Sequence, residues 1–137
     1  MSRHRSRPPN PGIHRRTRLK VIDNSLIGKQ AVMAGKPAYC IWVYRQGYRK
    51  KHMPHAHLGD KILVAIKGEK RKAYVVGMAE HRDIIKHGIP RTDTNNIVLV
   101  DDDGNPIGTR ILGPIPGVLR KNRQEMGKLL AIATKWI

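Results

Sequence analysis

Three histidines lie close together in the pattern H-x-x-H-x-H, formed by His52, His55 and His57. Neutral imidazoles at short spacing can bind zinc or nickel. A structural zinc site normally adds cysteines or a fourth close ligand, but the single cysteine of the chain, Cys40, lies well upstream of the histidines and has no partner. We therefore interpret this segment as a basic loop and expect no metal site there.

The sequence DDDGNPIGTRILGPIP, residues 101–116, suggests a second cation site. An EF-hand calcium loop needs ligands at positions 1, 3, 5 and 12 and glycine at position 6. Counted from Asp101, position 6 is Pro106 and position 12 is Leu112, so the pattern fails. The dipeptide Asp103-Gly104 instead predicts a tight turn, because glycine adopts positive φ without steric cost.

The sequence also contains no recognisable catalytic arrangement. Cys40 lies in the strand-like segment AYCIWVY, which is typical of a small buried hydrophobic residue. Asp23, Asn24 and Ser25 read as a turn with side-chain caps, and Ser25 is not in a Gly-x-Ser-x-Gly elbow. Neither a Walker A sequence nor a Gly-x-Gly-x-x-Gly sequence is present. We expect no enzymatic activity, catalytic residue, metal or cofactor.

The charge balance indicates a polyanionic partner. The 137 residues include 27 Lys and Arg against 10 Asp and Glu, a formal net charge of +17. Such an excess opposes compaction unless a polyanion neutralises it. Nucleic acid is the favoured partner and an anionic membrane surface the weaker alternative. No apolar run approaches the roughly 20 residues that cross a bilayer, so we expect no membrane span.

Aromatic residues are scarce: Trp42, Trp136, four Tyr and no Phe. Proteins that read exposed bases use aromatic side chains as stacking surfaces, so we expect binding to folded RNA through phosphates and shape. The candidate phosphate-binding residues are Arg3, Arg5, Arg7, Arg15, Arg16 and Arg18 near the N-terminus, Arg45, Arg49, Lys50 and Lys51 in one charged loop, Lys67, Lys70, Arg71 and Lys72 in a second, and Arg120, Lys121 and Arg123 near the C-terminus.

Residues 1–16 form an expected basic arm, and residues 17–137 form one domain. The arm lacks acidic residues and resembles an organelle transit peptide, but Pro8, Pro9 and Pro11 oppose an amphipathic helix. We interpret it as an extended arm that lies on an anionic surface, and leave its role in targeting, and its cleavage, open.

The rest of the chain is mainly β. Short β-branched runs bounded by turn residues predict strands at 19–22, 38–44, 61–66, 73–77 and 96–100. Their spacing favours a small barrel or a sandwich, and their successive apolar residues favour a closed sheet. Charged loops are expected at 45–60, 67–72 and 81–96. Residues 118–124 suggest a short helix, and residues 128–137 are left as either a helix or a last strand.

Four ordered segments carry a resemblance to a known family. They are RLKVIDNS at 18–25, GDKILVAIKGEKRKA at 59–73, TDTNNIVLVDDDGNPIGTRI at 92–111, and NPIGTRILGPIPGVLRK at 105–121. Together they resemble the universal large-subunit ribosomal protein L-fourteen family over roughly residues 17–134. The Pro-Ile-Pro at 114–116 and the Ala-Ile-Ala ending look like its mitochondrial branch. The extra residues at 26–37 and the shorter segment around 67–75 depart from the bacterial pattern.

The resemblance implies a five-stranded β-barrel with a small C-terminal helical portion. It implies a structural role in the large ribosomal subunit, in the mitochondrial matrix, with large-subunit ribosomal RNA and neighbouring ribosomal proteins as partners. It also implies a bridge to small-subunit RNA at the intersubunit face, where a ribosome-silencing factor docks. Thr109 and Arg110 match the exposed loop of the family, and we expect them to contact that partner. The three Asp could turn this edge away from RNA and toward a basic protein.

Three alternatives stay open from the sequence. The same role in a bacterial or plastid ribosome is one of them. A metal-dependent nuclease that uses the histidines or the aspartates is disfavoured by the failed ligand spacings. A protein held on chromatin or on a membrane surface by charge alone would not associate stoichiometrically with ribosomes.

Overall fold

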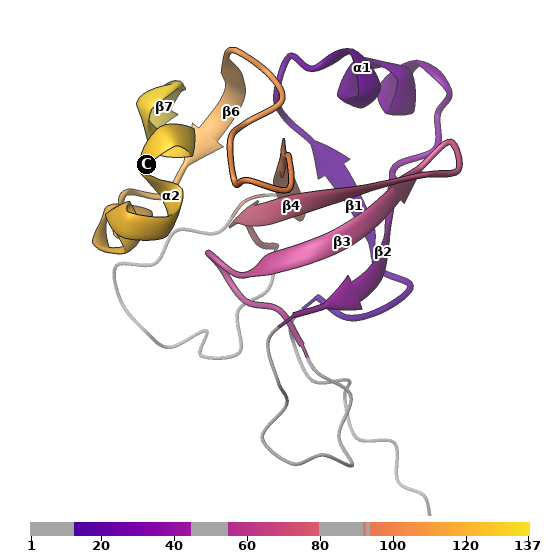
Figure 1. The fold of residues 1–137 in the computed structure, drawn as a ribbon, viewed down its shortest axis with the longest axis horizontal. Helices are drawn as coiled ribbons and strands as arrows, with labels where there is room; N and C mark the ends of the chain where they lie inside the picture. Colours follow the sequence, from indigo (N-terminus) through magenta and orange to yellow (C-terminus); the bar gives the residue numbers. More distant parts are fainter. Residues whose placement is uncertain (1–12, 45–54, 80–91, 93) are drawn as a thin grey trace, which may run out of the picture.

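The computed structural model describes residues 13–44, 55–79, 92 and 94–137 (Figure 1). Most of the expected arm therefore lies outside the described residues, as do residues 45–54 and the segment 80–91. Several candidate phosphate-binding residues fall in these segments, and their placement stays a prediction: Arg3, Arg5, Arg7, Arg45, Arg49, Lys50 and Lys51.

Five strands close into a barrel, which confirms the expected fold. They are β1 (Arg18–Val21), β2 (Ala38–Val43), β3 (Lys61–Ile66), β4 (Glu69–Gly77) and β5 (Asn96–Val100). Each strand pairs with the next in antiparallel fashion, and β1 closes the barrel by pairing in parallel with β5. Closure leaves the barrel sheet without a free edge.

The residue pattern of the strands explains how the barrel is filled. In β3 the residues alternate, so that Ile62, Val64 and Ile66 are buried inside. All five residues of β5 are buried because both of its faces are covered. Ile97 and Leu99 belong to the core inside the barrel, whereas neighbouring residues of β5 belong to a second apolar cluster with the C-terminal segment. The successive apolar residues in the sequence thus reflect burial on both faces.

The C-terminal segment packs beside the barrel (Figure 1). It contains β6 (Ile111–Ile115), the 3₁₀ helix η1 (Gly117–Asn122), α2 (Arg123–Ala131) and β7 (Ala133–Trp136), with β6 and β7 paired in parallel. The expected short helix at 118–124 therefore spans the junction of η1 and α2. The ambiguous segment 128–137 is both helix and strand. The buried apolar side chains of the C-terminal segment include those of Ile111, Ile115, Leu119, Met126 and Leu129.

A helix that was not expected from the sequence, α1 (Leu26–Met33), lies at one end of the barrel (Figure 1). Ser25 caps it, since its side chain accepts a hydrogen bond from the Gly28 N–H. Gly28 allows the close approach: a Cβ atom there would lie 2.7 Å from a methyl carbon of Val21. The helix occupies most of the extra segment at 26–37, and the turn with side-chain caps expected at 23–25 is confirmed.

The prediction of a charged loop over residues 67–72 is wrong, because the loop is shorter than expected. Only Lys67 and Gly68 form the turn, and Glu69–Lys72 belong to β4. Both turn residues have positive φ, 50° and 80°, which defines the two-residue turn that matches the twist of antiparallel strands. Charged residues here line a strand, because strand pairing with β3 outweighs their low intrinsic preference for strands.

Cys40 is buried in the barrel, as its sequence context predicts. Burial raises the pKa of its thiol to about 11, because the charged thiolate would lose its hydration. The raised pKa favours the folded state below about pH 9, and this contribution is lost as the pH rises through about 11. The neutral thiol is a poor nucleophile.

We therefore expect Cys40 to resist alkylation in the folded protein. At pH 8 the thiolate fraction falls about 100-fold when the pKa rises by two units, and burial adds a steric barrier. Iodoacetamide labelling followed by mass spectrometry should be at least about 100-fold slower in buffer than in urea. Equal rates in the two conditions would show that the thiol is accessible in the folded barrel.

Candidate RNA-binding and partner-contact surfaces

The loop at 106–110 is fixed to the end of β1 by one asparagine side chain. The Asn24 side-chain carbonyl accepts hydrogen bonds from the backbone N–H groups of Thr109, at 2.8 Å, and Arg110, at 3.0 Å. Its amide group donates to the Thr109 hydroxyl at 2.9 Å. The backbone adds a bond from the Asn24 N–H to the Arg110 carbonyl. Sequence reasoning placed Asn24 in a turn but missed this function, which joins residues 85 positions apart.

The neighbouring Asp23 connects this corner to the barrel. Its buried carboxylate accepts hydrogen bonds from the Leu99 N–H of β5, and from both the N–H and the hydroxyl of Ser25. Ser25 in turn caps α1 through Gly28. One carboxylate thus positions the end of β1, the start of α1 and the middle of β5.

Thr109 and Arg110, the predicted partner-contact residues, lie together on the exposed surface of this fixed loop. The Thr109 hydroxyl has a structural role as the acceptor from Asn24. The Arg110 side chain has no hydrogen bond or ion pair within the described part of the chain. Its guanidinium therefore keeps its forked set of donors for a phosphate or a carboxylate.

Gly108 makes the loop attachment possible. A Cβ atom at this position would lie 2.7 Å from the Asn24 side-chain oxygen and 3.1 Å from the backbone nitrogen of Ser25. Real Cβ atoms do not approach this closely, so any larger residue must displace the loop or the corner. The glycine is therefore required by contact, and not by an unusual backbone angle.

Replacing Gly108 with alanine should lower the free energy of unfolding by about 1–3 kcal/mol, because it overpacks the contact with Asn24. Urea denaturation followed by circular dichroism measures this change. Gly127→Ala is the matched control, since a Cβ there meets nothing within 4 Å and lies in α2. The control should raise stability by about 0.5–1 kcal/mol. Unchanged stability of Gly108→Ala would contradict the attachment.

The three aspartates at 101–103, just before this loop, differ in their contacts. The Asp101 carboxylate accepts hydrogen bonds from the N–H groups of Asp103 and Asn105, and Gly104 completes the turn at φ 85°. Asp102 pairs with Lys72 of β4 at 3.3 Å. The turn expected at Asp103-Gly104 is confirmed. The idea that the run faces a basic protein stays a prediction, and replacing all three with asparagine without loss of partner affinity would refute it.

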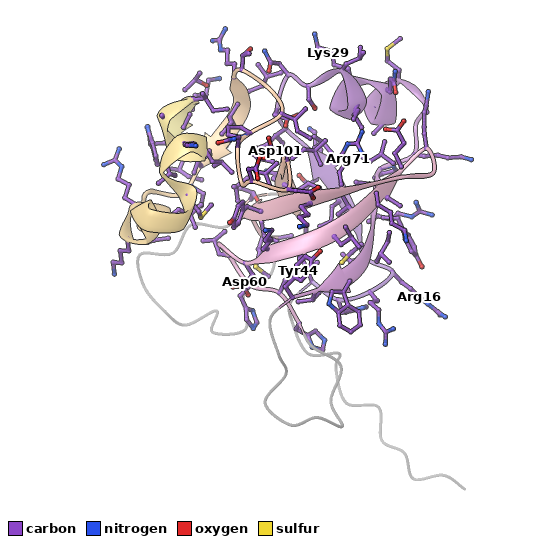
Figure 2. The ribbon with its side chains drawn as sticks, in the orientation of Figure 1. Arg16, Lys29, Tyr44, Asp60, Arg71 and Asp101 are labelled. Atoms are coloured by element: carbon purple, nitrogen blue, oxygen red, sulfur yellow. The ribbon has the colours of Figure 1, made fainter. Side chains whose placement is uncertain are left out.

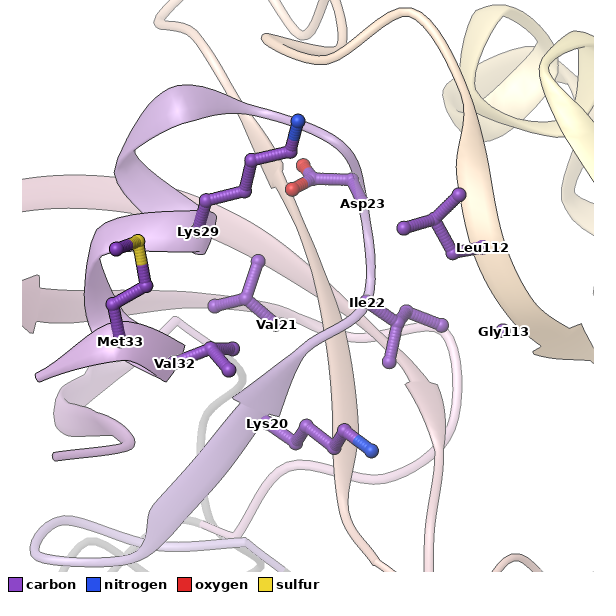
Figure 3. A pocket seen from close by; sticks show the side chains of 10 residues that line it. Lys20, Val21, Ile22, Asp23, Lys29, Val32, Met33, Leu112 and Gly113 are labelled. Carbon is purple, nitrogen blue, oxygen red and sulfur yellow. The ribbon is translucent and has the colours of Figure 1, made fainter. Parts of the chain in front are cut away.

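An apolar groove lies between α1, the end of β1 and β6 (Figure 3). Its volume is about 490 Å³, and its walls include Val21, Val32 and Leu112. Lys20 and Lys29 also line it. Val32, Met33 and Leu112 are exposed to more than half of their area.

Two of the four basic residues in the hairpin between β3 and β4 form ion pairs within the protein, and two do not. Arg71 pairs with Glu69 at 3.1 Å, and Lys72 pairs with Asp102. Lys67 and Lys70 are exposed and form no ion pair within the described residues. The sequence predicted all four as equivalent, and the structure separates two partnered cations from two that are open to a phosphate.

Other predicted basic residues lie beside aromatic rings. The Arg18 guanidinium carbon is 4.8 Å from the centre of the Tyr39 ring, and that of Arg120 is 4.2 Å from the Trp136 ring. Arg15 approaches a third ring in the same way. Arg16 and Lys121 are exposed, and Arg123 begins α2. Among the residues that the structure describes, the predicted cations therefore come from several separate elements and do not form one cluster.

The remaining chemical candidates gain no support. Among the described residues no three His, Cys, Asp or Glu side chains are placed to share a metal ion, and His52 lies outside these residues. His55 lies against the ring of His14, with centroids 5.3 Å apart. In the described part of the chain, no helix combines the length and the hydropathy that a membrane span requires.

A closed barrel with a basic surface and a fixed, exposed Thr-Arg loop is typical of a small scaffold protein that binds a polyanion. Comparison with protein families agrees with this class: residues 12–137 match the family described as ribosomal protein L14p/L23e. The chain belongs to this family. It is a structural ribosomal protein and not an enzyme, with ribosomal RNA and neighbouring ribosomal proteins as its partners.

A relative with a known name shows which kind of family member this chain is similar to. The large ribosomal subunit protein uL14m of Danio rerio is 42% identical over 125 residues, which cover 91% of this chain and 81% of the relative. The resemblance seen in the four sequence segments is thus confirmed over nearly the whole chain.

Proposed function

We propose that this protein is a structural constituent of the large subunit of the mitochondrial ribosome, in the matrix. The observation that carries the proposal is the match to the L14p/L23e family together with the identity to a large-subunit protein designated uL14m, the name of a mitochondrial ribosomal protein. The net charge of +17 supports a location in which RNA phosphates neutralise the protein.

Within the subunit, the predicted basic residues bind phosphates of large-subunit RNA while the barrel fixes their positions. The described members that are exposed, and that have neither an ion pair nor an aromatic ring beside them among the described residues, are Arg16, Lys67, Lys70 and Lys121. The arm and the loop at 45–51 extend the same contact beyond the described residues. Phosphate contacts of this kind position a protein on RNA without reading its sequence.

Whereas the basic residues bind RNA, the loop that carries Thr109 and Arg110 contacts a protein partner. In the proposed arrangement the loop lies at the intersubunit face, where it binds a ribosome-silencing factor. The same face of the protein contributes to a bridge with small-subunit RNA. The fixed backbone at Asn24 supports this role, because a rigid loop loses little entropy on binding. Leu112, only two residues beyond Arg110, leads from the loop into the apolar groove.

Replacing Arg110 with alanine should weaken binding of the silencing factor to isolated large subunits by about tenfold or more, because a charge-assisted hydrogen bond is lost. Co-sedimentation with increasing concentrations of the factor measures the change. Arg120→Ala is a matched control, since this exposed arginine lies on Trp136. Equal loss in both variants, or no loss in Arg110→Ala, would contradict the assignment of the loop.

The overall role is tested by depleting the protein from cells. Pulse labelling with cytosolic translation blocked should show loss of protein synthesis in the organelle, while cytosolic synthesis continues. Gradient profiles should show fewer mature mitochondrial large subunits. Normal organelle synthesis after full depletion would contradict the proposal.

A further inference from the structure

Half of the six aromatic residues of the chain gather on one face of the barrel. The register of β2 against β3 places Tyr39 beside Ala65 and Trp42 beside Leu63, all on the outer surface. These two aromatic residues are three positions apart and would face opposite sides of a regular strand. A register shift between Cys40 and Trp42 adds one residue and restores the outward direction.

Tyr44 completes the row directly after β2. Its N–H group donates to the Lys61 carbonyl of β3, and the intervening Val43 is buried inside the barrel. Trp42 is 43% exposed and Tyr44 is 41% exposed. We call Tyr39, Trp42 and Tyr44 the β2 aromatic row. The row runs along β2, and Tyr44 at its last position lies toward the end of the barrel opposite α1, as the positions of Tyr44 and Lys29 show (Figure 2).

Each ring of the row has a cation beside it. Arg18 lies 4.8 Å from the centre of the Tyr39 ring, Arg15 lies 5.8 Å from Trp42, and Lys61 lies 5.9 Å from Tyr44. The three cations come from β3, from β1 and from the segment before β1. The fold thus alternates rings and positive charges along one exposed face.

No acidic side chain interrupts this face among the described residues of the first three strands. The outward positions there are Arg18 and Lys20 on β1, Tyr39 and Trp42 on β2, and Lys61, Leu63 and Ala65 on β3. Glu69 follows the hairpin turn and pairs with Arg71. The face therefore offers flat apolar rings and positive charge together.

We propose that the β2 aromatic row binds unpaired nucleotides of ribosomal RNA, an inference that rests on the proposed ribosomal function and names one of its contacts. Bases stack on Trp42 and Tyr44, while Arg15 and Lys61 neutralise the phosphates beside them. Sheet faces of RNA-binding modules stack two or three bases in this way. Guanidinium planes also stack on bases, so the neighbouring arginines add to the surface.

A base-stacking face differs from what the amino-acid composition predicts. Six aromatic residues in 137 suggested that the protein does not read exposed bases. Their number is small, but the register shift in β2 concentrates three of them where RNA phosphates are also expected. Position on the sheet therefore matters more than abundance.

Fluorescence of the full chain provides a direct test. In the Trp136→Phe variant, Trp42 is the only tryptophan. Titration with a hexamer of adenylate should quench its emission, whereas an abasic hexamer with the same phosphates should not. Affinity for the adenylate hexamer should exceed that for the abasic hexamer by roughly 5- to 150-fold for each stacked base.

Matched variants separate stacking from folding. Trp42→Val keeps a strand-forming residue and should abolish the preference for the adenylate hexamer, measured by anisotropy of a labelled RNA, whereas Trp42→Phe should retain most of it. Trp136→Val is the control, because Trp136 is also exposed in a strand and also lies beside an arginine. It should leave the preference unchanged.

Equal affinity of the unaltered protein for the two hexamers, or an equal effect of Trp42→Val and Trp136→Val, would overturn the inference. The proposed function would survive either result if the protein still sediments with the large subunit. Failure of the proposed function is a different outcome, in which the protein does not sediment with the subunit at all.

Discussion

Replacing Asp23 with alanine is expected to lower the free energy of unfolding by about 3 kcal/mol. The substitution leaves the buried N–H groups of Leu99 and Ser25 without their acceptor, and each such group costs about 1–3 kcal/mol. Total stabilities of small domains are only about 5–15 kcal/mol. Chemical denaturation followed by circular dichroism measures the loss.

Two further variants make this result specific. Asp102→Ala removes a carboxylate that is 92% exposed, and it should change stability by no more than about 0.5 kcal/mol. Asp23→Asn keeps an acceptor oxygen and should cost less than Asp23→Ala. Similar stability of Asp23→Ala and Asp102→Ala would show that the corner does not connect β1, α1 and β5.

Replacing both Lys67 and Lys70 with alanine is expected to weaken binding to large-subunit RNA by about 30-fold at 0.15 M salt. Each lost phosphate contact removes about 0.9 from the slope of log K against log salt, or roughly fivefold in affinity at this concentration. The slope should therefore fall by about 1.8 in magnitude. Filter binding over a range of salt concentrations measures both quantities.

The paired cations of the same hairpin provide the control. Arg71→Ala with Lys72→Ala removes the same formal charge, but these side chains are engaged with Glu69 and Asp102. This double variant should lose less affinity and change the slope less. Equal losses of affinity in the two double variants would mean that the ion pairs of Arg71 and Lys72 break when RNA binds. The structure of the free protein would then not predict which cations contribute most to RNA affinity.

The sequence predicted the barrel well because its strands have strong local signals. Residues 61–66 and 96–100 were predicted with the bounds of β3 and β5. Turn residues and β-branched runs determine such strands locally. The β4 strand extends farther than predicted because its first residues are charged, and only pairing with β3 makes them a strand.

Elements that depend on distant contacts could not be predicted. β6 contains Gly113 and Pro114, residues that disfavour strands, and it forms through pairing with β7 far along the chain. Helix α1 exposes Leu26 and Met33, so its sequence lacks a clear apolar face. Its cap at Ser25 was the only local signal.

The candidate surfaces also combine residues that the sequence predicts with contacts that only the fold creates. The exposed Thr109 and Arg110 follow from the resemblance of their loop to the family. The hydrogen bonds that fix this loop come from Asn24, and only the fold brings the two together. The β2 aromatic row likewise depends on a register shift that could not be predicted from the sequence.

Sedimentation of the tagged protein from a mitochondrial lysate tests the central claim most directly. One gradient contains magnesium, and a second contains chelator to separate the subunits. We predict stoichiometric movement with the large subunit in both. Protein that stays at the top of the gradient would contradict the ribosomal function, and protein found only in non-mitochondrial ribosomes would contradict the compartment.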